Sequence, residues 1–334
     1  MRESHTFMKN LFDYATKELS QDAFLRWLFE SYDCDESVSK CAIKLLRAFS
    51  DDDSLQIEKI ENLKTYAQWK KVDVLVTFKH EDKIFCIAIE DKTFTSDHDD
   101  QLQKYNDELT GYCEGLKGED NCQNVISKVI YYKTSPVCVE ERNRIEINDG
   151  WKVFDINQIY ELFNSCISTD SEILCSYIAY IAKVHNACHN KNKPDSNEGN
   201  IDFLKWEAYF RNTIIPKLSR KNYDVGVWKA GQYPYICLVI KKTDISKKIP
   251  YLEIRSRDCL NNNFTARILL YEVDRTEEQL ENLRANIKAS KFEIQNYKQQ
   301  AGISPENETA KTDEDFISLV EEYASEYLNV MKDW

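Results

Sequence analysis

Two stretches joined by a short link decide the fold of this chain: VDVLVTF, residues 72–78, and KIFCIAIE, residues 83–90. Apolar residues alternate with others in the first stretch, which is typical of a β-strand. The second is almost wholly apolar and predicts a central strand that is buried on both faces. Because the polar link HEDK, residues 80–83, centres a turn between them, we expect an antiparallel hairpin.

The position of this turn also predicts which side chains of the two strands meet. It places Asp73 opposite Glu90, and directly opposed residues on neighbouring strands share a face. Lys92 lies two residues beyond Glu90, so its side chain is expected on the same face. Two carboxylates and an ammonium group should therefore converge at one end of the hairpin.

This cluster of charges has two interpretations. Desolvated carboxylates raise each other's proton affinity, and a divalent cation such as Mg²⁺, which takes oxygen ligands, would compensate them. The cation would activate a water molecule for attack on phosphorus, with Lys92 placing that nucleophile or shielding the phosphate charge. The alternative is a salt bridge between Lys92 and a neighbouring acid at a solvated strand end, since short acidic motifs occur by chance.

Helices and strands alternate on both sides of the hairpin. A polar segment with Pro194 and Gly199, NKNKPDSNEGN, predicts a boundary between a first domain over 1–192 and a second over 200–334. Several strands and two closing helices make the second an α+β domain. Predicted helices cover 21–29 with Ser20 as N-cap, 37–49, a segment from Asp97, 158–163, 172–189 and 203–214; predicted strands lie at 125–134, 151–156, 225–228, 235–242, 251–256 and 265–273.

The composition indicates a globular protein. A chain of 334 residues that is 42% hydrophobic can build two cores. No apolar run approaches the roughly 20 residues of a membrane-spanning helix, and the start lacks a signal peptide's apolar stretch, so we expect a cytoplasmic protein that does not enter membranes. The 11 cysteines are scattered without a CxxC pair, which predicts reduced thiols.

The charge distribution is uneven. A net charge of −13 is the opposite of what a general nucleic-acid binder shows. Residues 201–275, however, contain 14 Lys and Arg against 8 Asp and Glu, interleaved with aromatic residues. A nucleic-acid surface and an ordinary charged rim are both compatible with this pattern. The residues concerned are Lys217, Arg220, Lys221, Lys241, Lys242, Lys247, Lys248, Arg255 and Arg257, with Tyr223, Trp228, Tyr233 and Tyr235.

At the hairpin and its flanks the chain resembles a known family. The run IAIEDKTFTSDHDDQLQKY, residues 87–105, and the upstream ELSQDAFLRWLF, residues 18–29, are similar to the PD-(D/E)XK nuclease superfamily. The resemblance is to a prokaryotic branch in which an E-x-K strand precedes a helix carrying Q-L-x-x-Y. It covers about residues 10–135, with four elements in the right order, and the proline of the motif is replaced by Val72.

The resemblance implies a restriction-endonuclease-like α/β/α sandwich around a mixed sheet. It also implies an endonuclease that uses Mg²⁺, with Mn²⁺ as a substitute, to hydrolyse phosphodiester bonds, and the family's setting suggests prokaryotic defence against phage or mobile elements. We expect DNA more than RNA as the nucleic acid that it binds, although the sequence does not decide between them. Its matching positions are Asp73 and Glu90 as metal ligands, Lys92 as the catalytic lysine, the carbonyl of Asp91 as a further ligand, Glu18 as an assisting acid, and Gln101 and Tyr105 as residues that position the lysine or contact substrate.

Simpler explanations exist for several of these residues. Glu18 suits the first turn of any helix, and a buried tyrosine such as Tyr105 is more often structural. His98 fits a solvated loop, and His185 and His189 fit a helix end better than a metal site. The rival functions are a module that keeps the nuclease fold without cutting and a protein-interaction scaffold; substrate preference and self-association into a homo-oligomer stay open.

Overall fold

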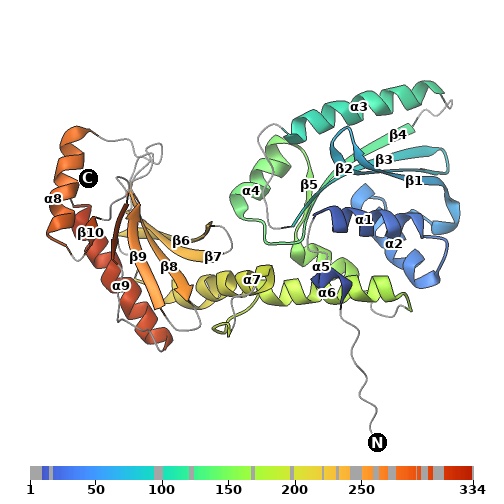
Figure 1. Ribbon diagram of the computed structural model, residues 1–334. Coiled ribbons are helices and arrows are strands. Elements are labelled where there is room, and N and C mark those ends of the chain that lie inside the picture. Colours follow the sequence, from blue (N-terminus) through green and yellow to red (C-terminus); the bar gives the residue numbers. More distant parts are fainter. Residues whose placement is uncertain are drawn as a thin grey trace, which may run out of the picture. The chain divides into compact units, whose positions relative to one another are not determined.

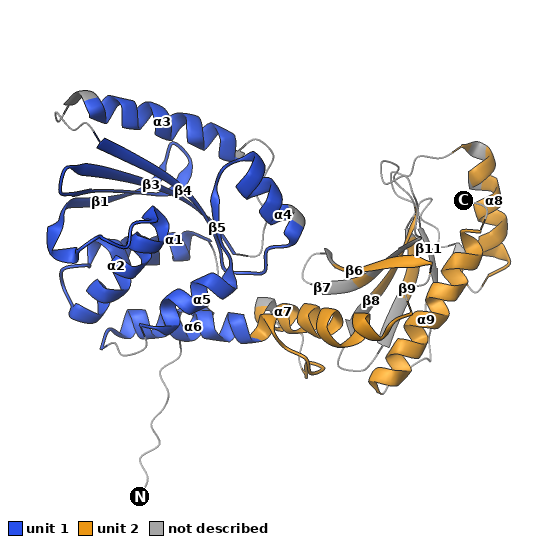
Figure 2. Ribbon diagram, turned by 180° about the vertical axis from the view of Figure 1, so that it is seen from behind, with its two compact units in different colours: residues 1–186 blue, residues 187–334 orange. Residues whose placement is uncertain are grey.

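The computed structural model of the chain divides into two compact units, Met1–Asn186 and Ala187–Trp334 (Figure 2). The first has an α/β fold with a mixed sheet, and the second combines helices with an antiparallel sheet, so the predicted fold class is confirmed. The structure describes residues 10–14, 18–93, 101–119, 124–166, 170–195, 199–219, 222–230, 233–240, 250–258, 263–269, 276–290, 292–294, 300–303 and 312–332.

The sheet of the first unit has five strands in the order β1-β2-β3-β4-β5 (Figure 1). Strands β1, β2 and β3 pair antiparallel, whereas β4 and β5 join parallel to the edge of β3. This makes β3 the central strand, as its apolar sequence predicts. The strands are β1 Ile60–Trp69, β2 Val72–His80, β3 Lys83–Lys92, β4 Asn124–Lys133 and β5 Lys152–Phe154.

The hairpin of β2 and β3 has the predicted register. His80 pairs with Lys83 across a two-residue turn in which Glu81 has a left-handed backbone, φ 57°. The ladder continues to the pair of Val74 and Ile89, and one further step sets Asp73 opposite Glu90. The turn chemistry therefore determines which residues meet at the far end of the hairpin.

Helices cover both faces of this sheet (Figure 1). Helix α3 packs on one face, where Leu102, Tyr105 and Leu109 belong to the same hydrophobic core as the small side chains Cys86 and Ala88 of β3. Helices α1 and α2 cover the opposite face. The helices are α1 Glu18–Glu30, α2 Glu36–Ser50, α3 Gln101–Glu119, α4 Val139–Asn143, α5 Ile156–Asn164 and α6 Glu172–Cys188, with short turns at Leu11–Asp13, Ile57–Lys59 and Arg144–Asn148.

Two local predictions for the first unit are wrong or incomplete. Helix α1 already begins at Glu18, so Ser20 lies within its first turn and is not the N-cap; an acid in the first turn suits the helix dipole. Strand β1 was not predicted, because only Ile60 and Thr65 among its ten residues are buried. An exposed edge strand lacks the alternating pattern that identifies strands in sequence.

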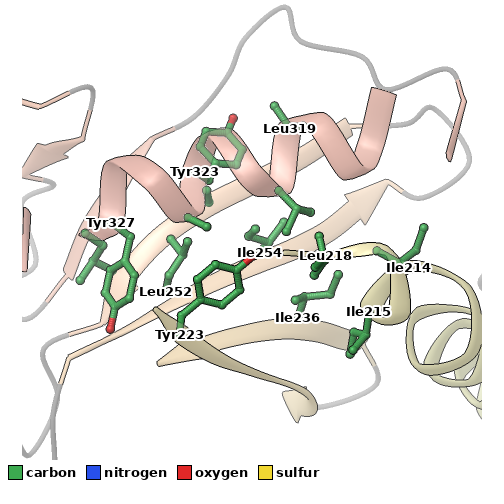
Figure 3. Packing of buried hydrophobic residues seen from close by; sticks show 14 of the residues in the cluster. Ile214, Ile215, Leu218, Tyr223, Ile236, Leu252, Ile254, Leu319, Tyr323 and Tyr327 are labelled. Carbon is green, nitrogen blue, oxygen red and sulfur yellow. The ribbon is translucent and has the colours of Figure 1, made fainter. Parts of the chain in front are cut away.

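The second unit has a six-stranded antiparallel sheet in the order β10-β11-β9-β8-β7-β6. The apolar stripe of α9, including Leu319, Tyr323 and Tyr327, packs against Leu252 and Ile254 of this sheet (Figure 3). The elements are α7 Gly199–Tyr209, a π turn Phe210–Ile214, a 3-10 turn Ile215–Lys217, β6 Tyr223–Ala230, β7 Tyr233–Ile240, β8 Tyr251–Asp258, β9 Asn263–Leu269, α8 Glu277–Lys288, β10 Glu293–Ile294, β11 Gln300–Ile303 and α9 Asp313–Val330.

The structure bears on three further expectations from the sequence. Tyr223 is only 2% exposed and belongs to the core of the second unit, so it is not part of an exposed aromatic surface. The cysteines whose side chains are described carry free thiols, as expected. Among the described helices, none is long and apolar enough to cross a membrane.

Candidate active site

Asp73, Glu90 and Lys92 lie together at the ends of β2 and β3. The Lys92 Nζ donates a hydrogen bond to Glu90 Oε1 over 2.5 Å, and both side chains are almost completely buried. The Asp73 Oδ2 accepts a hydrogen bond of 2.9 Å from the backbone N–H of Asp91, the residue between Glu90 and Lys92. The predicted convergence of two carboxylates and an ammonium group is thus observed.

A second contact holds the Asp73 carboxylate from the neighbouring strand. Gln68, near the end of β1, donates from Nε2 to Asp73 Oδ1 over 2.9 Å. Three residues at this turn have left-handed backbones: Gln68 with φ 49°, Lys70 with φ 51° and Lys71 with φ 77°. Non-glycine residues adopt this conformation at an energetic cost, and such strained residues are common at sites where a side chain must be held in a particular position.

The first two turns of α1 lie over the ends of the strands. Glu18 Oε1 accepts a hydrogen bond from the backbone N–H of Thr93 at 3.4 Å, just beyond Lys92. One turn later, Asp22 is 4% exposed. Next to it, Gln21 donates from Nε2 to the hydroxyl of Thr134 at 2.9 Å, which ties α1 to the end of β4.

Asp91 is a buried acid on the other layer of the sheet. Side chains alternate along β3, and the residues that face α3 are the even-numbered ones, so Asp91 points away from that helix. It has no exposed surface, and neither carboxyl oxygen has a hydrogen-bond partner within the described part of the chain. Such a group is costly to bury, because the interior replaces none of its water contacts.

Burial and mutual repulsion perturb the acids of this site. Burial, followed by the charge of Asp73, raises the pKa of Glu90 to about 8. Burial and then Asp73 and Glu18 raise the pKa of Asp22 to about 7. The pKa of Asp91 rises well above its usual range, by burial first and then by the charge of Asp22.

The pKa of the lysine of the site is also raised, which for a lysine favours the charged form. Burial by itself would lower the pKa of Lys92, but the Glu90 carboxylate and then Asp73 outweigh it and raise that pKa. A second lysine, Lys133, pairs with Lys92 in the register of β3 and β4, yet its Nζ lies 2.7 Å from the Glu141 carboxylate. Lys133 therefore does not offset the acidic excess, and one ammonium group faces several carboxyl groups.

The donor set fits a hard divalent cation. Mg²⁺ takes oxygen ligands and keeps several waters, so two carboxylates and a backbone carbonyl are enough protein ligands. No group of three or more His, Cys, Asp or Glu side chains within the described residues is arranged to hold a metal by itself. Within the described residues, both carboxyl oxygens of Asp91 and Oδ1 of Asp22 are buried without a hydrogen-bond partner, and the charge of Lys92 does not prevent the rise in the pKa of either acid.

Other predicted residues occupy different surroundings. Tyr105 is 4% exposed, with its ring 6.3 Å from that of Trp151 in the core under α3. Its contact with substrate stays a prediction. His185 stacks on Tyr160, with ring centroids 4.0 Å apart, at the end of α6. Lys241, Lys242 and His98 lie outside the described residues, as do the side chains of Gln101, which begins α3, and of Arg255 in β8.

The ends of β2 and β3 thus bring two carboxylates and a lysine together in a mixed sheet. The PD-(D/E)XK nuclease superfamily matches residues 4–188 of the chain. This span is more than half of the sequence and contains the whole candidate site, so the chain belongs to that superfamily. No curated protein and no solved structure matches the chain significantly.

Two residues of the site were not found from the sequence. Asp22 lies one helical turn after Glu18, and this spacing on a predicted helix could have identified it as a second acid facing the sheet. Gln68 has no comparable signal, because its role depends on a turn that contains no glycine or proline.

Proposed function

We propose that the chain is a metal-dependent nuclease that hydrolyses phosphodiester bonds, with DNA as the preferred substrate. Membership of the PD-(D/E)XK nuclease superfamily supports this proposal. The observation that carries it is the juxtaposition of the Asp73 carboxylate with the buried pair of Glu90 and Lys92. Internal cleavage, and a role in prokaryotic defence against phage, follow from the family's setting.

Each residue has a proposed role. Asp73 and Glu90, with the backbone carbonyl of Asp91, hold Mg²⁺, and Mn²⁺ substitutes for it. The bound cation supplies Lewis acidity, which lowers the pKa of a water molecule and stabilises charge on the phosphate. Lys92 holds the attacking water or shields the phosphate oxygens, and Glu18 orients the surrounding waters through its carboxylate.

The remaining predicted residues serve the substrate. Gln101 and Tyr105, on α3, help to position Lys92 or contact the substrate backbone. Lys241, Lys242 and Arg255 of the second unit contact phosphates, which suits the excess of positive charge in residues 201–275. We further propose that the second unit binds substrate or mediates assembly into a homo-oligomer.

A cleavage assay tests this function. Purified protein is incubated with Mg²⁺ or Mn²⁺ and with single- and double-stranded DNA and RNA. The wild type should cleave and Lys92→Ala should not, whereas Lys83→Ala, at the opposite end of the same strand, should cleave like the wild type. Absence of cleavage by the wild type, or equal cleavage by Lys92→Ala, would remove the enzymatic proposal.

A binding module that does not cut is the second candidate. It is favoured by the 2.5 Å contact between Lys92 and Glu90, because this ion pair gives each group a partner of opposite charge without a cation. Calorimetry separates the two candidates. Metal binding that depends on Asp73, together with no cleavage of any substrate, would support the module.

A further inference from the structure

A groove of about 660 Å³ opens on the first unit beside the candidate active site. It lies between α3 and the turn that joins β1 to β2. Trp69, on its wall, pairs with Val72, the residue before Asp73, and the adjacent Gln68 contacts the Asp73 carboxylate. The groove is lined by Trp69, Lys70, Lys104, Asp107, Glu108, Gly111 and Tyr112.

Two aromatic rings form the wall of the groove. Trp69 and Tyr112 are half-buried, with ring centroids 5.2 Å apart and planes inclined by 63°. The groove is open at Gly111, where an added Cβ would meet no atom within 4 Å apart from its chain neighbours and the backbone of its own helix. Flat apolar surface beside open volume suits a planar ring, and base–aromatic stacking needs no particular base.

The charged residues of the groove suit the phosphates and the base of a nucleotide at different positions. Lys70 and Lys104 are exposed, so these cations can reach phosphates outside the groove. Lys70 Nζ also lies 3.7 Å from the Glu108 carboxylate. Asp107 and Glu108 would repel a phosphate inside the groove. Carboxylates accept hydrogen bonds from the N–H groups on the pairing edge of a base, and these donors are available only when the base is unpaired.

We propose that this groove is a subsite for one unpaired nucleotide of the substrate strand. The base lies against Trp69 and Tyr112, and its phosphates face Lys70 and Lys104. The inference rests on the proposed nuclease function for the identity of the strand, and it specifies that the strand is unpaired next to the cleaved bond. A pocket volume of 660 Å³ is ample for one nucleotide.

Two glycines of the same helix provide a matched test. Gly111→Leu fills the groove, whereas Gly115→Leu adds the same side chain one turn further along α3, outside the groove lining. An added Cβ meets nothing within 4 Å at either position, and both substitutions favour the helix, so both variants should fold. Circular dichroism and thermal unfolding confirm this before binding is measured.

Binding is measured by fluorescence anisotropy in EDTA at low salt. The probes are a fluorescein-labelled single-stranded DNA of about 12 nucleotides, the same sequence as RNA, and the same DNA in a duplex. We expect the wild type and Gly115→Leu to bind the single strand equally. Gly111→Leu should bind it at least about fivefold more weakly, with little change for the duplex, since stacking of one base is lost.

Equal single-strand affinities of Gly111→Leu and Gly115→Leu would overturn the inference, as would failure of the wild type to bind any single strand. An equal loss of duplex affinity in Gly111→Leu would also overturn it, because the groove would then not select unpaired bases. DNA and RNA probes identify the sugar. The binding assay contains EDTA and no metal, so its result does not depend on whether the protein cleaves. The cleavage assay with Lys92→Ala tests the proposed nuclease function on its own.

Discussion

Each unit of the protein buries an acid in its sheet, and the two acids are treated differently. Glu253 of β8 is 1% exposed, and its Oε2 accepts a hydrogen bond of 2.9 Å from Arg267 Nε on the neighbouring strand β9. Asp91 of β3 is equally buried, yet its carboxyl oxygens have no hydrogen-bond partner in the described residues, and Asp22 and Asp73 add further negative charge near it.

This difference distinguishes a buried ion pair that stabilises the fold from a cluster of buried acids at a candidate site. The pair in the second unit is neutral in sum, and removal of either partner would take an opposite charge away from the other. In the first unit the acids destabilise one another, and their raised pKa values record that cost. Unfavourable electrostatics at strand ends are expected where a protein must bind a cation.

Substitution of Glu90 should give the largest effect on activity. Glu90→Gln removes a proposed metal ligand and should reduce cleavage by a factor on the order of 10² to 10³. The same change should not lower the melting temperature of the metal-free protein at about pH 8, since burial and the charge of Asp73 disfavour the charged carboxylate there even beside Lys92. Cleavage kinetics and differential scanning fluorimetry measure the two effects, and a large loss of stability would show that Glu90 supports the fold instead.

Substitution of Arg267 should mainly reduce stability, in contrast to substitution of Glu90. Arg267→Met removes the guanidinium that contacts the buried Glu253 carboxylate, and we expect a loss of about 3 kcal/mol in the free energy of unfolding of the second unit. Urea unfolding measures this loss. The double variant Glu253→Leu/Arg267→Met should recover most of it, because both charges are then absent. If the single variant is as stable as the wild type, the contrast between the two buried acids is incorrect.

The dependence of stability on pH should show the cost of the first unit's acids. Glu90 and Asp22 have pKa values raised to about 8 and about 7, so the folded protein keeps protons that the unfolded chain has lost. Their contribution to stability is therefore present at about pH 4 and is lost as the pH rises to about 8, by at most about 1.4 kcal/mol per pH unit for each proton.

Mg²⁺ should counteract this loss, because the cation binds the deprotonated carboxylates. Its stabilising effect should grow between about pH 6 and about pH 8, and it should be weaker in Glu90→Gln. Thermal unfolding with and without Mg²⁺ across this range measures both effects. A stabilisation by Mg²⁺ that is independent of pH would place its binding elsewhere.

The part of the fold that local patterns determine was predictable from the sequence. Period-two alternation and a tight turn give both the β2–β3 hairpin and the meeting of Asp73 with Glu90. Strand β1 was missed, since an edge strand with exposed residues on both faces has no hydrophobic period. The side-chain environment of Asp91 was also missed, because burial on the far face of β3 depends on how α1 packs.

Gln68 marks the limit of such prediction and gives the smallest expected effect. Gln68→Ala removes the hydrogen bond to Asp73 Oδ1 and should reduce cleavage about tenfold, with an increase in the Mg²⁺ concentration needed for half-maximal activity.

Two further variants separate the hydrogen bond from the backbone strain at this position. Gln68→Gly removes the side chain and also the energetic cost of the left-handed backbone, whereas Gln68→Asn adopts that backbone readily but has a shorter amide side chain. If the role of Gln68 is to orient Asp73, the Gly and Asn variants should both lose activity as Gln68→Ala does. Of these two variants, Gln68→Gly should gain more stability relative to Gln68→Ala. Full activity in all three variants would mean that the Asp91 N–H alone holds the Asp73 carboxylate, and the strained turn would then serve the groove beside it.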